Sequence, residues 1–357
     1  MKKILASLLT LTLLLSLIAC SQTVEEERGW YPYDLSEYVE LMDWHGVQAE
    51  FADPEVCTEE EIDDAILQVM LTYASFDEKD GPAELYDAVL CDFYVYFGEE
   101  LLDDMTQTDY EIILGQASLS EMDRAMADAM IGCVPGDVCH AEYTYPESTY
   151  LYGELAEKTV RLAAEVKAVY GSAIPECDEA FVRDLPDTDF ETVDDFRAAV
   201  KQDVLDQKKE NRVYAVWSAY YAAARVLRYP EFEIRQYEDD YLSYYREYAE
   251  EYEMEMDAFL QEYFDATLEE FEAEAKEYAE NAVKNDMIFT QLSRLMGTTL
   301  SEEEYQEGLA AYYEKEKSQY ETLEAFVDHY GEDVIRENLI WDKSLRAMAE
   351  QAVRIEP

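Results

Sequence analysis

The run Val89-Leu90-Cys91-Asp92-Phe93-Tyr94-Val95-Tyr96 decides the fold of the central part of the chain. It is rich in β-branched and aromatic residues, which are typical of strands. Three more runs of this kind follow: Tyr110–Leu114, Val138–Tyr145 and Val160–Val169. A short helix is predicted between them, over Glu121–Ile131, and Gly132 closes it. These elements predict a small antiparallel α+β domain over residues 85–172.

Outside this domain the sequence predicts helices. Apolar residues recur with a period near 3.6 from about residue 190 to the end of the chain. Capping residues indicate where helices begin: Thr58 with Glu61, Thr192 with Asp195, Thr267 with Glu270, and Ser301 with Glu304. Pro230 and Gly297 mark stops or kinks. The predicted fold class is therefore α+β, with a small sheet domain followed by an all-helical domain.

The first twenty residues are typical of a bacterial lipoprotein signal. Met1-Lys2-Lys3 is a basic start, an apolar run continues to Ala19, and Leu17-Ile18-Ala19-Cys20 resembles a lipobox. We expect a signal peptide over residues 1–19, lipidation of Cys20 and a tether over 20–36, which would place the protein outside the cytoplasm on the cell membrane. The alternatives are an ordinary signal peptide and an uncleaved anchor with an incidental cysteine.

The charge of the chain restricts its partners. Acidic residues outnumber basic ones 83 to 27, and the net charge is −56. Such a field repels nucleic acid and anionic lipid headgroups, so neither is an expected partner. Disorder is common at this charge, but 49% hydrophobic residues and 30 tyrosines are enough to build cores. We expect a folded protein with an acidic surface.

Cysteine and histidine give no sign of a metal site or cofactor. Five cysteines follow Cys20 at scattered positions: Cys57, Cys91, Cys133, Cys139 and Cys177. Cys133 and Cys139 flank a Pro135-Gly136 turn and could face each other, but free buried thiols are an equally good interpretation. No histidine among His45, His140 and His329 has metal-ligand spacing with another ligand. We expect neither a metal nor a cofactor.

Several segments, in order along the chain, resemble bacterial trigger factor. They are Tyr38–Val47, Asp92-Phe93, Tyr110–Gly115, Met130–Asp137, Tyr145-Pro146-Glu147 with Tyr150, Glu154–Lys158, Pro175–Phe181 and Phe190–Arg197. The resemblance covers about residues 36–350. It implies a linker segment with one helix over 37–84, a peptidyl-prolyl isomerase domain of FKBP type over 85–172, and a chaperone domain over 173–357. The ribosome-binding domain of the family is missing, so no ribosomal partner is expected.

The resemblance implies a proline-binding site in the sheet domain. Such a site uses an apolar, aromatic cup rather than a nucleophile or a metal. The positions that match it are Asp92, Phe93, Leu101, Met122, Met126, Ile131, Tyr150 and Leu162. Most of the aromatic residues of the family are replaced by Leu or Met here. Two functions stay open: an extracytoplasmic folding factor with isomerase activity, and a non-catalytic chaperone with a degenerate site. Both would act on unfolded or newly secreted polypeptides.

A row of tyrosines in the helical region is the candidate client-binding surface. Tyr237, Tyr241, Tyr244, Tyr245, Tyr248 and Tyr252 recur at helical spacing among acidic residues. They could form the packed face of a bundle, with their hydroxyls at the water edge. They could also be exposed and contact apolar segments of a client. Solvent exposure of the rings distinguishes the two interpretations.

Overall fold

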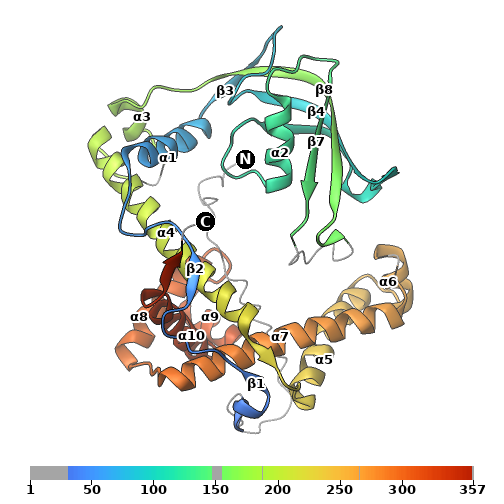
Figure 1. Cartoon of the computed structure of the whole chain (residues 1–357), viewed down its shortest axis with the longest axis vertical. Helices are drawn as coiled ribbons and strands as arrows, with labels where there is room; N and C mark the ends of the chain where they lie inside the picture. Colours follow the sequence, from blue (N-terminus) through green and yellow to red (C-terminus); the bar gives the residue numbers. More distant parts are fainter. Residues whose placement is uncertain (1–30, 147–154, 187, 265, 356–357) are drawn as a thin grey trace. The chain divides into compact units, whose positions relative to one another are not determined.

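The chain forms two compact units in a computed structural model that describes residues 31–146, 155–186, 188–264 and 266–355 (Figure 1). Glu55–Asp206 belongs to the first unit. The second unit contains the described residues up to Pro54 and those of Gln207–Pro357. The expected signal peptide with Cys20, and Tyr150 of the expected proline site, lie outside the described residues. The α+β fold class is confirmed.

A six-stranded antiparallel sheet forms the main body of the first unit. Its strands are β3 (Ser75–Glu78), β4 (Ala88–Phe97), β5 (Glu100–Leu101), β6 (Gln107–Ile113), β7 (Val138–Thr144) and β8 (Thr159–Ala173). β8 lies between β3 and β4 and also pairs with β7, while β4 also pairs with β5 and β6. Buried and half-buried residues alternate along β4, which gives the sheet one apolar face.

Helix α2 (Glu121–Met130) covers the apolar face of this sheet (Figure 1). Ser120 caps its first turn by accepting a hydrogen bond from the Asp123 amide. The helix ends before Gly132, whose φ of +89° lies in the region that favours glycine. The predicted helix over Glu121–Ile131 is thus confirmed to within one residue.

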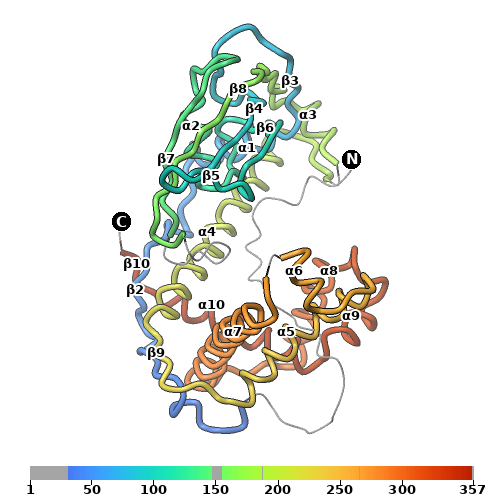
Figure 2. The backbone as a smooth tube through the Cα atoms, turned by 90° about the vertical axis from the view of Figure 1, so that its right-hand side faces the viewer, coloured from blue at the N-terminus to red at the C-terminus, as the bar shows by residue number. Residues whose placement is uncertain are grey.

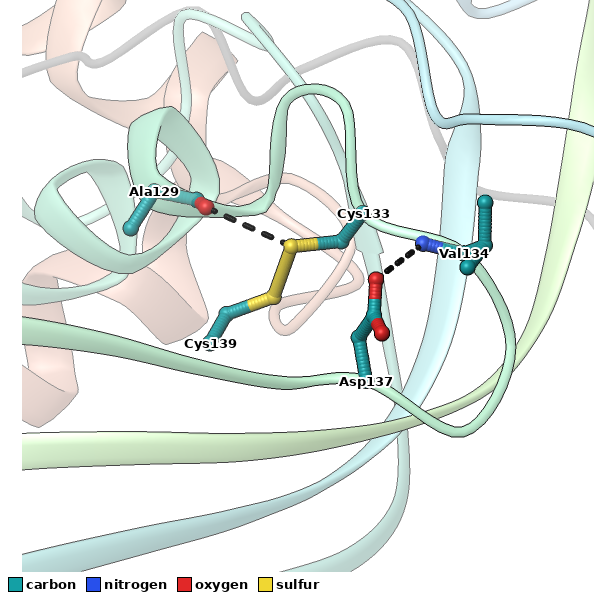
Figure 3. Close-up of a disulfide and its surroundings, with 5 residues drawn as sticks. All are labelled: Ala129, Cys133, Val134, Asp137 and Cys139. Atoms are coloured by element: carbon teal, nitrogen blue, oxygen red, sulfur yellow. Dashed lines mark hydrogen bonds between the residues drawn. A yellow bond between two sulfur atoms is a disulfide. The ribbon is translucent and has the colours of Figure 1, made fainter.

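A disulfide joins Cys133, after α2, to Cys139 on β7 (Figure 3). Sγ of Cys133 also contacts the carbonyl oxygen of Ala129 on α2 at 3.6 Å. The sequence left open a disulfide or two free thiols at these positions, and the structure has the disulfide. The thiols of Cys57, Cys91 and Cys177 are free.

Three helices make a second, smaller core in the first unit. They are α1 (Glu59–Leu71), α3 (Glu179–Arg183) and the first part of α4 (Val193–Ala223). The predicted start at Thr58 is confirmed, because Thr58 and Glu61 form a complete capping box. Gln68 of α1 bonds to the carbonyl of Gly115 and the amide of Ala117, which ties this core to the loop before α2.

The second unit is mostly helical. Its helices are the end of α4, α5 (Glu231–Glu251), α6 (Met256–Tyr263), α7 (Leu268–Met296), α8 (Glu302–Glu316), α9 (Leu323–Tyr330) and α10 (Glu332–Glu350). The predicted capping boxes at Thr267 and Ser301 are present, and Gly297 ends α7 in the left-handed conformation. Trp217, Phe289 and Trp341 stack in its core, with ring centroids 4.1 and 5.0 Å apart.

Residues before Pro54 belong to the core of the second unit. β1 (Val39–Glu40) pairs with β9 (Arg225–Val226), and β2 (Gln48–Glu50) pairs with β10 (Val353–Ile355), two ribbons that helical periodicity does not predict. Tyr31 and Leu35 fall in the stretch expected to be a tether, yet both are buried in this core. Within the described residues, no helix is both long and apolar enough to span a membrane.

Candidate functional site: a closed sheet core and an aromatic hairpin

Three residues of the expected proline site lie in one core that is closed to solvent. Phe93 comes from the centre of β4, Met126 from α2 and Leu162 from β8, and their exposed fractions are 1%, 0% and 0%. A proline ring cannot contact these three side chains unless the domain's own side chains move. The fold therefore brings these three expected residues together, but it places them in the interior of the domain and not in an open site.

Side chains that sequence reasoning did not single out help to close this core. The hydroxyl of Tyr145 contacts the sulfur of Met105 at 3.9 Å and that of Met122 at 3.7 Å, and Met122 is half-buried. Leu102 packs on the core, whereas its neighbour Leu101 pairs with Tyr96 at the edge of the sheet. Soft methionine sulfur fills irregular gaps between rings well. Tyr145 belongs to a segment that resembles trigger factor, and this resemblance was the sequence signal that could have added it to the expected site.

Two expected site residues lie away from the core. Ile131, at the C-cap of α2, is 48% exposed. Asp92 points to the opposite face of the sheet from Phe93, since successive side chains in a strand alternate. Its carboxylate lies 2.5 Å from the Lys167 ammonium and accepts a hydrogen bond from the Asp109 amide. Lys167, more than the Asp109 amide, holds the pKa of Asp92 below its usual range.

The described residues offer little for covalent or metal chemistry in this domain. Burial, more than the nearby Asp92 charge, raises the pKa of the Cys91 thiol to about 12, so it stays protonated near neutral pH. No group of three or more His, Cys, Asp or Glu side chains in the described part of the chain could hold a metal ion. What the sheet core offers chemically is apolar surface, and that surface is buried.

We call α5, α6 and the first half of α7 the aromatic hairpin. Unlike the sheet core, it has exposed aromatic side chains. α5 and α7 run side by side in both views, with α6 at the far end (Figures 1 and 2). Its small core holds Leu242, Phe259 and Phe271. Pro230 precedes α5, and the Thr267 capping box begins α7. The starts of the hairpin's two long helices are thus set by local sequence.

The tyrosines of α5 divide into two rows. Tyr237, Tyr241 and Tyr245, the inner row, face α7. Tyr237 donates a hydrogen bond to Asp286, Tyr241 donates one to Glu274 at 2.9 Å, and the Tyr245 ring lies 4.7 Å from that of Phe271. For Tyr237 and Tyr241, burial is the largest cause that raises the pKa, followed by the acidic partners, so both hydroxyls stay protonated.

Tyr244, Tyr248 and Tyr252 form the outer row and are exposed by 55%, 40% and 54%. Successive residues of an α-helix are rotated by about 100°, so the row that starts at Tyr244 lies beside the row that includes Tyr245, on a different side of the helix. Tyr263 and Phe264, at the end of α6, are exposed by 50% and 47%. The expected client-binding residues therefore separate: Tyr237 and Tyr241 pack inward, and the outer row faces solvent.

Ring contacts connect the exposed aromatics into two groups, which are joined by the buried Phe259. The Tyr244 ring lies 5.0 Å from Tyr248 and 5.3 Å from Tyr245, which lies 5.5 Å from Phe264. Tyr252 lies 5.3 Å from Tyr263. Between Tyr244 and Phe264 the sequence has seven acidic residues and one basic residue. The result is an aromatic surface within a negatively charged surround.

Comparison with known proteins identifies relatives of one kind. No protein-family model matches the chain. It is 24% identical to trigger factor of Caldicellulosiruptor bescii over 298 residues, which cover 82% of this chain and 66% of that protein. Trigger factor of Pelotomaculum thermopropionicum is 24% identical over 308 residues, with 83% and 67% covered. The chain spans about two thirds of the length of these relatives. It is a distant homologue of trigger factor over most of its length.

A solved structure of a trigger factor chaperone, described for promiscuous substrate recognition in folding and assembly, also matches. The likeness covers 87% of this chain and 72% of that one, with 18% identity and a TM-score of 0.39.

Proposed function

We propose that this protein is a lipid-anchored, extracytoplasmic chaperone that binds non-native polypeptides through the exposed aromatic surface of its hairpin. The observation that carries the proposal is the outer tyrosine row, continued by Tyr263 and Phe264. Tyrosine rings have large apolar faces and polar tips, so they contact unfolded chains without demanding one sequence. The acidic surround keeps a chaperone with a bound apolar segment soluble. Distant homology to trigger factor supports the same function.

Buried Phe93, Met126 and Leu162 favour a chaperone without isomerase activity over one with it. Isomerisation of an X-Pro bond faces a barrier of about 18–20 kcal/mol, and a cup must contact the proline to lower it. A proline ring has no exposed aromatic surface to contact at these three positions. Turnover of a model X-Pro peptide by the purified protein decides between the two: the proposal expects the uncatalysed rate.

Suppression of client aggregation tests the proposed chaperone activity. The purified protein is mixed with a chemically denatured client, and light scattering is followed after dilution. We expect suppression by the natural chain and its loss in a variant with Tyr244→Ser, Tyr248→Ser and Tyr252→Ser. Tyr214→Ser is the matched control, because Tyr214 on α4 is 52% exposed but lies outside the hairpin. Equal suppression by all three proteins contradicts the proposal.

The lipid anchor is proposed from Met1–Cys20 and has its own test. Expression in a bacterial host with labelled palmitate should label the natural chain and leave Cys20→Ser unlabelled. The membrane fraction should lose the Cys20→Ser protein. Cys177→Ser, which changes a free cysteine in the first unit, should keep label and membrane association. A labelled Cys20→Ser protein contradicts the proposed anchor.

A further inference from the structure

Three carboxyl side chains lie around Tyr31 inside the second unit. Asp286 on α7 and Glu233 on α5 are 6% and 7% exposed, and Glu337 on α10 is half-buried. Tyr31, which is 1% exposed, interacts electrostatically with all three. We call Glu233, Asp286 and Glu337 the carboxyl cluster. It lies where the segment before β1 joins α5, α7 and α10.

Positive charge is scarce around the carboxyl cluster. The titratable and charged groups that face it are Tyr237 beside Glu233 on α5, Tyr31 and Tyr33 before β1, Arg294 on α7, and Asp333 beside Glu337 on α10. Arg228 also reaches Tyr33 and is paired with Glu37. Buried carboxylates need a paired cation or a proton. Arg294 is the cation that faces Glu337, and one cation cannot compensate both Asp286 and Glu337 if both are ionised.

Hydrogen bonding around the cluster is also incomplete. Oγ1 of Thr290 is buried and has no hydrogen-bond partner in the described chain, whereas the carboxyl group of Glu233 interacts with the Tyr33 hydroxyl. Thr290 follows Asp286 by one turn of α7, so both face the same side of the helix. A carboxylate that accepts few hydrogen bonds gains little from being ionised. Asp286 accepts a hydrogen bond from Tyr237, and its burial still favours the neutral, protonated form.

The acid–base behaviour of the cluster agrees with its surroundings. Burial raises the pKa of Asp286 to about 7, and the Tyr237 hydrogen bond opposes this rise only in part. Burial and then the Asp286 charge raise the pKa of Glu337 to about 8, while Arg294 lowers it. Both groups therefore change protonation close to neutral pH.

We propose that the carboxyl cluster is a proton-dependent latch that holds residues 31–41 against the helical unit. Tyr31 interacts electrostatically with the cluster, and Arg294 fixes the segment by donating to the backbone carbonyls of Tyr31 at 2.7 Å and Tyr33 at 3.1 Å. Loss of the protons of Asp286 and Glu337 leaves repelling charges near Tyr31 and draws Arg294 toward the carboxylates. The segment then loosens as the pH rises. Because it directly precedes β1, the latch sets how much chain before β1 is free.

Amide hydrogen exchange of the full chain, read by mass spectrometry, tests the latch. Protection factors, corrected for the intrinsic exchange rate at each pH, are compared for residues 31–41 at pH 6 and pH 8.5. We expect protection to fall by at least about tenfold in the natural chain, since each proton lost can change an opening equilibrium tenfold per pH unit. Protection of α1 in the first unit should change much less.

Two variants keep the size of the side chains but remove the titration. Asp286→Asn combined with Glu337→Gln should reduce the pH effect on residues 31–41 to less than threefold. Asp257→Asn, the same change at an exposed carboxyl of α6, should keep the full effect. Equal protection of the natural chain at both pH values overturns the latch, whether or not the double variant folds. So does a folded double variant that keeps the natural pH dependence.

Discussion

The sheet core and the aromatic hairpin use aromatic and methionine side chains in opposite ways. Around Phe93 the sheet and α2 close over the apolar groups, with Tyr145 and Met122 completing the cover. On the hairpin, α7 covers one tyrosine row of α5 and leaves the other open. A strand has only two faces, so one helix can seal its apolar side, whereas a helix can carry two adjacent aromatic rows. We therefore assign client binding to the hairpin.

The largest expected difference between the two regions is in stability. Phe93→Ala should lower the free energy of unfolding by about 3–5 kcal/mol, because it removes a buried ring and leaves a cavity. Tyr248→Ala on the hairpin should change it by less than about 0.5 kcal/mol, since that ring is exposed. Urea denaturation followed by circular dichroism measures both. If Phe93→Ala costs less than about 1 kcal/mol, the sheet core is not closed.

The contributions of Asp286 and Asp92 to stability should change in opposite directions as the pH rises. The pKa of buried Asp286 is raised, so its contribution to stability is full below the unfolded value of 3.8 and is lost as the pH rises through about 7. Between pH 5 and pH 7 this loss is about 2 kcal/mol, and Asp286→Asn should abolish it. The pKa of Asp92 is lowered, so its contribution is present above the unfolded value and lost as the pH falls. Urea midpoints at pH 3, 5, 7 and 8.5 compare Asp92→Asn with Asp286→Asn; the same sign for both contradicts the assignment.

Removing a helix cap should lower the free energy of unfolding by the same amount in both units. Thr58 and Thr267 each accept a hydrogen bond from a backbone amide and receive the capping-box glutamate in return. Each Thr→Ala change should cost about 1 kcal/mol, measured by thermal or urea unfolding. A much larger cost at Thr267 would show that the hairpin depends on its cap more than on its aromatic core. Thr→Ser at either position is the control and should cost less.

Local signals in the sequence predicted most elements of the fold. Thr58, Thr267 and Ser301 begin helices as expected, and Gly297 ends one, because capping needs only neighbouring residues. Pairing between distant segments was not predictable in this way. β9 and β10 are two and three residues long and gain their partners from β1 and β2, which are far away in sequence. The domain boundaries expected from the strand pattern and from the resemblance stay predictions.

The site was harder to predict than the fold. The resemblance brought Phe93, Met126 and Leu162 together, but their burial depends on Tyr145, Met105 and Leu102, which come from other parts of the chain. Spacing alone placed Tyr237 and Tyr248 in one row, and only the position of α7 separates them. The carboxyl cluster gave no sequence signal, since Glu233, Asp286 and Glu337 are three acids among 83. Burial distinguishes them, and burial is a tertiary property.

Site-specific photo-crosslinking tests the central claim most directly. A photoreactive phenylalanine analogue is placed at position 248 in the outer tyrosine row, at 101 beside the sheet core, and at 214 as an exposed control on α4. Each protein is irradiated with the same denatured client. The account predicts client adducts from position 248 and background levels from 101 and 214. Adducts from position 101 with none from 248 would move client binding to the sheet domain and contradict the account.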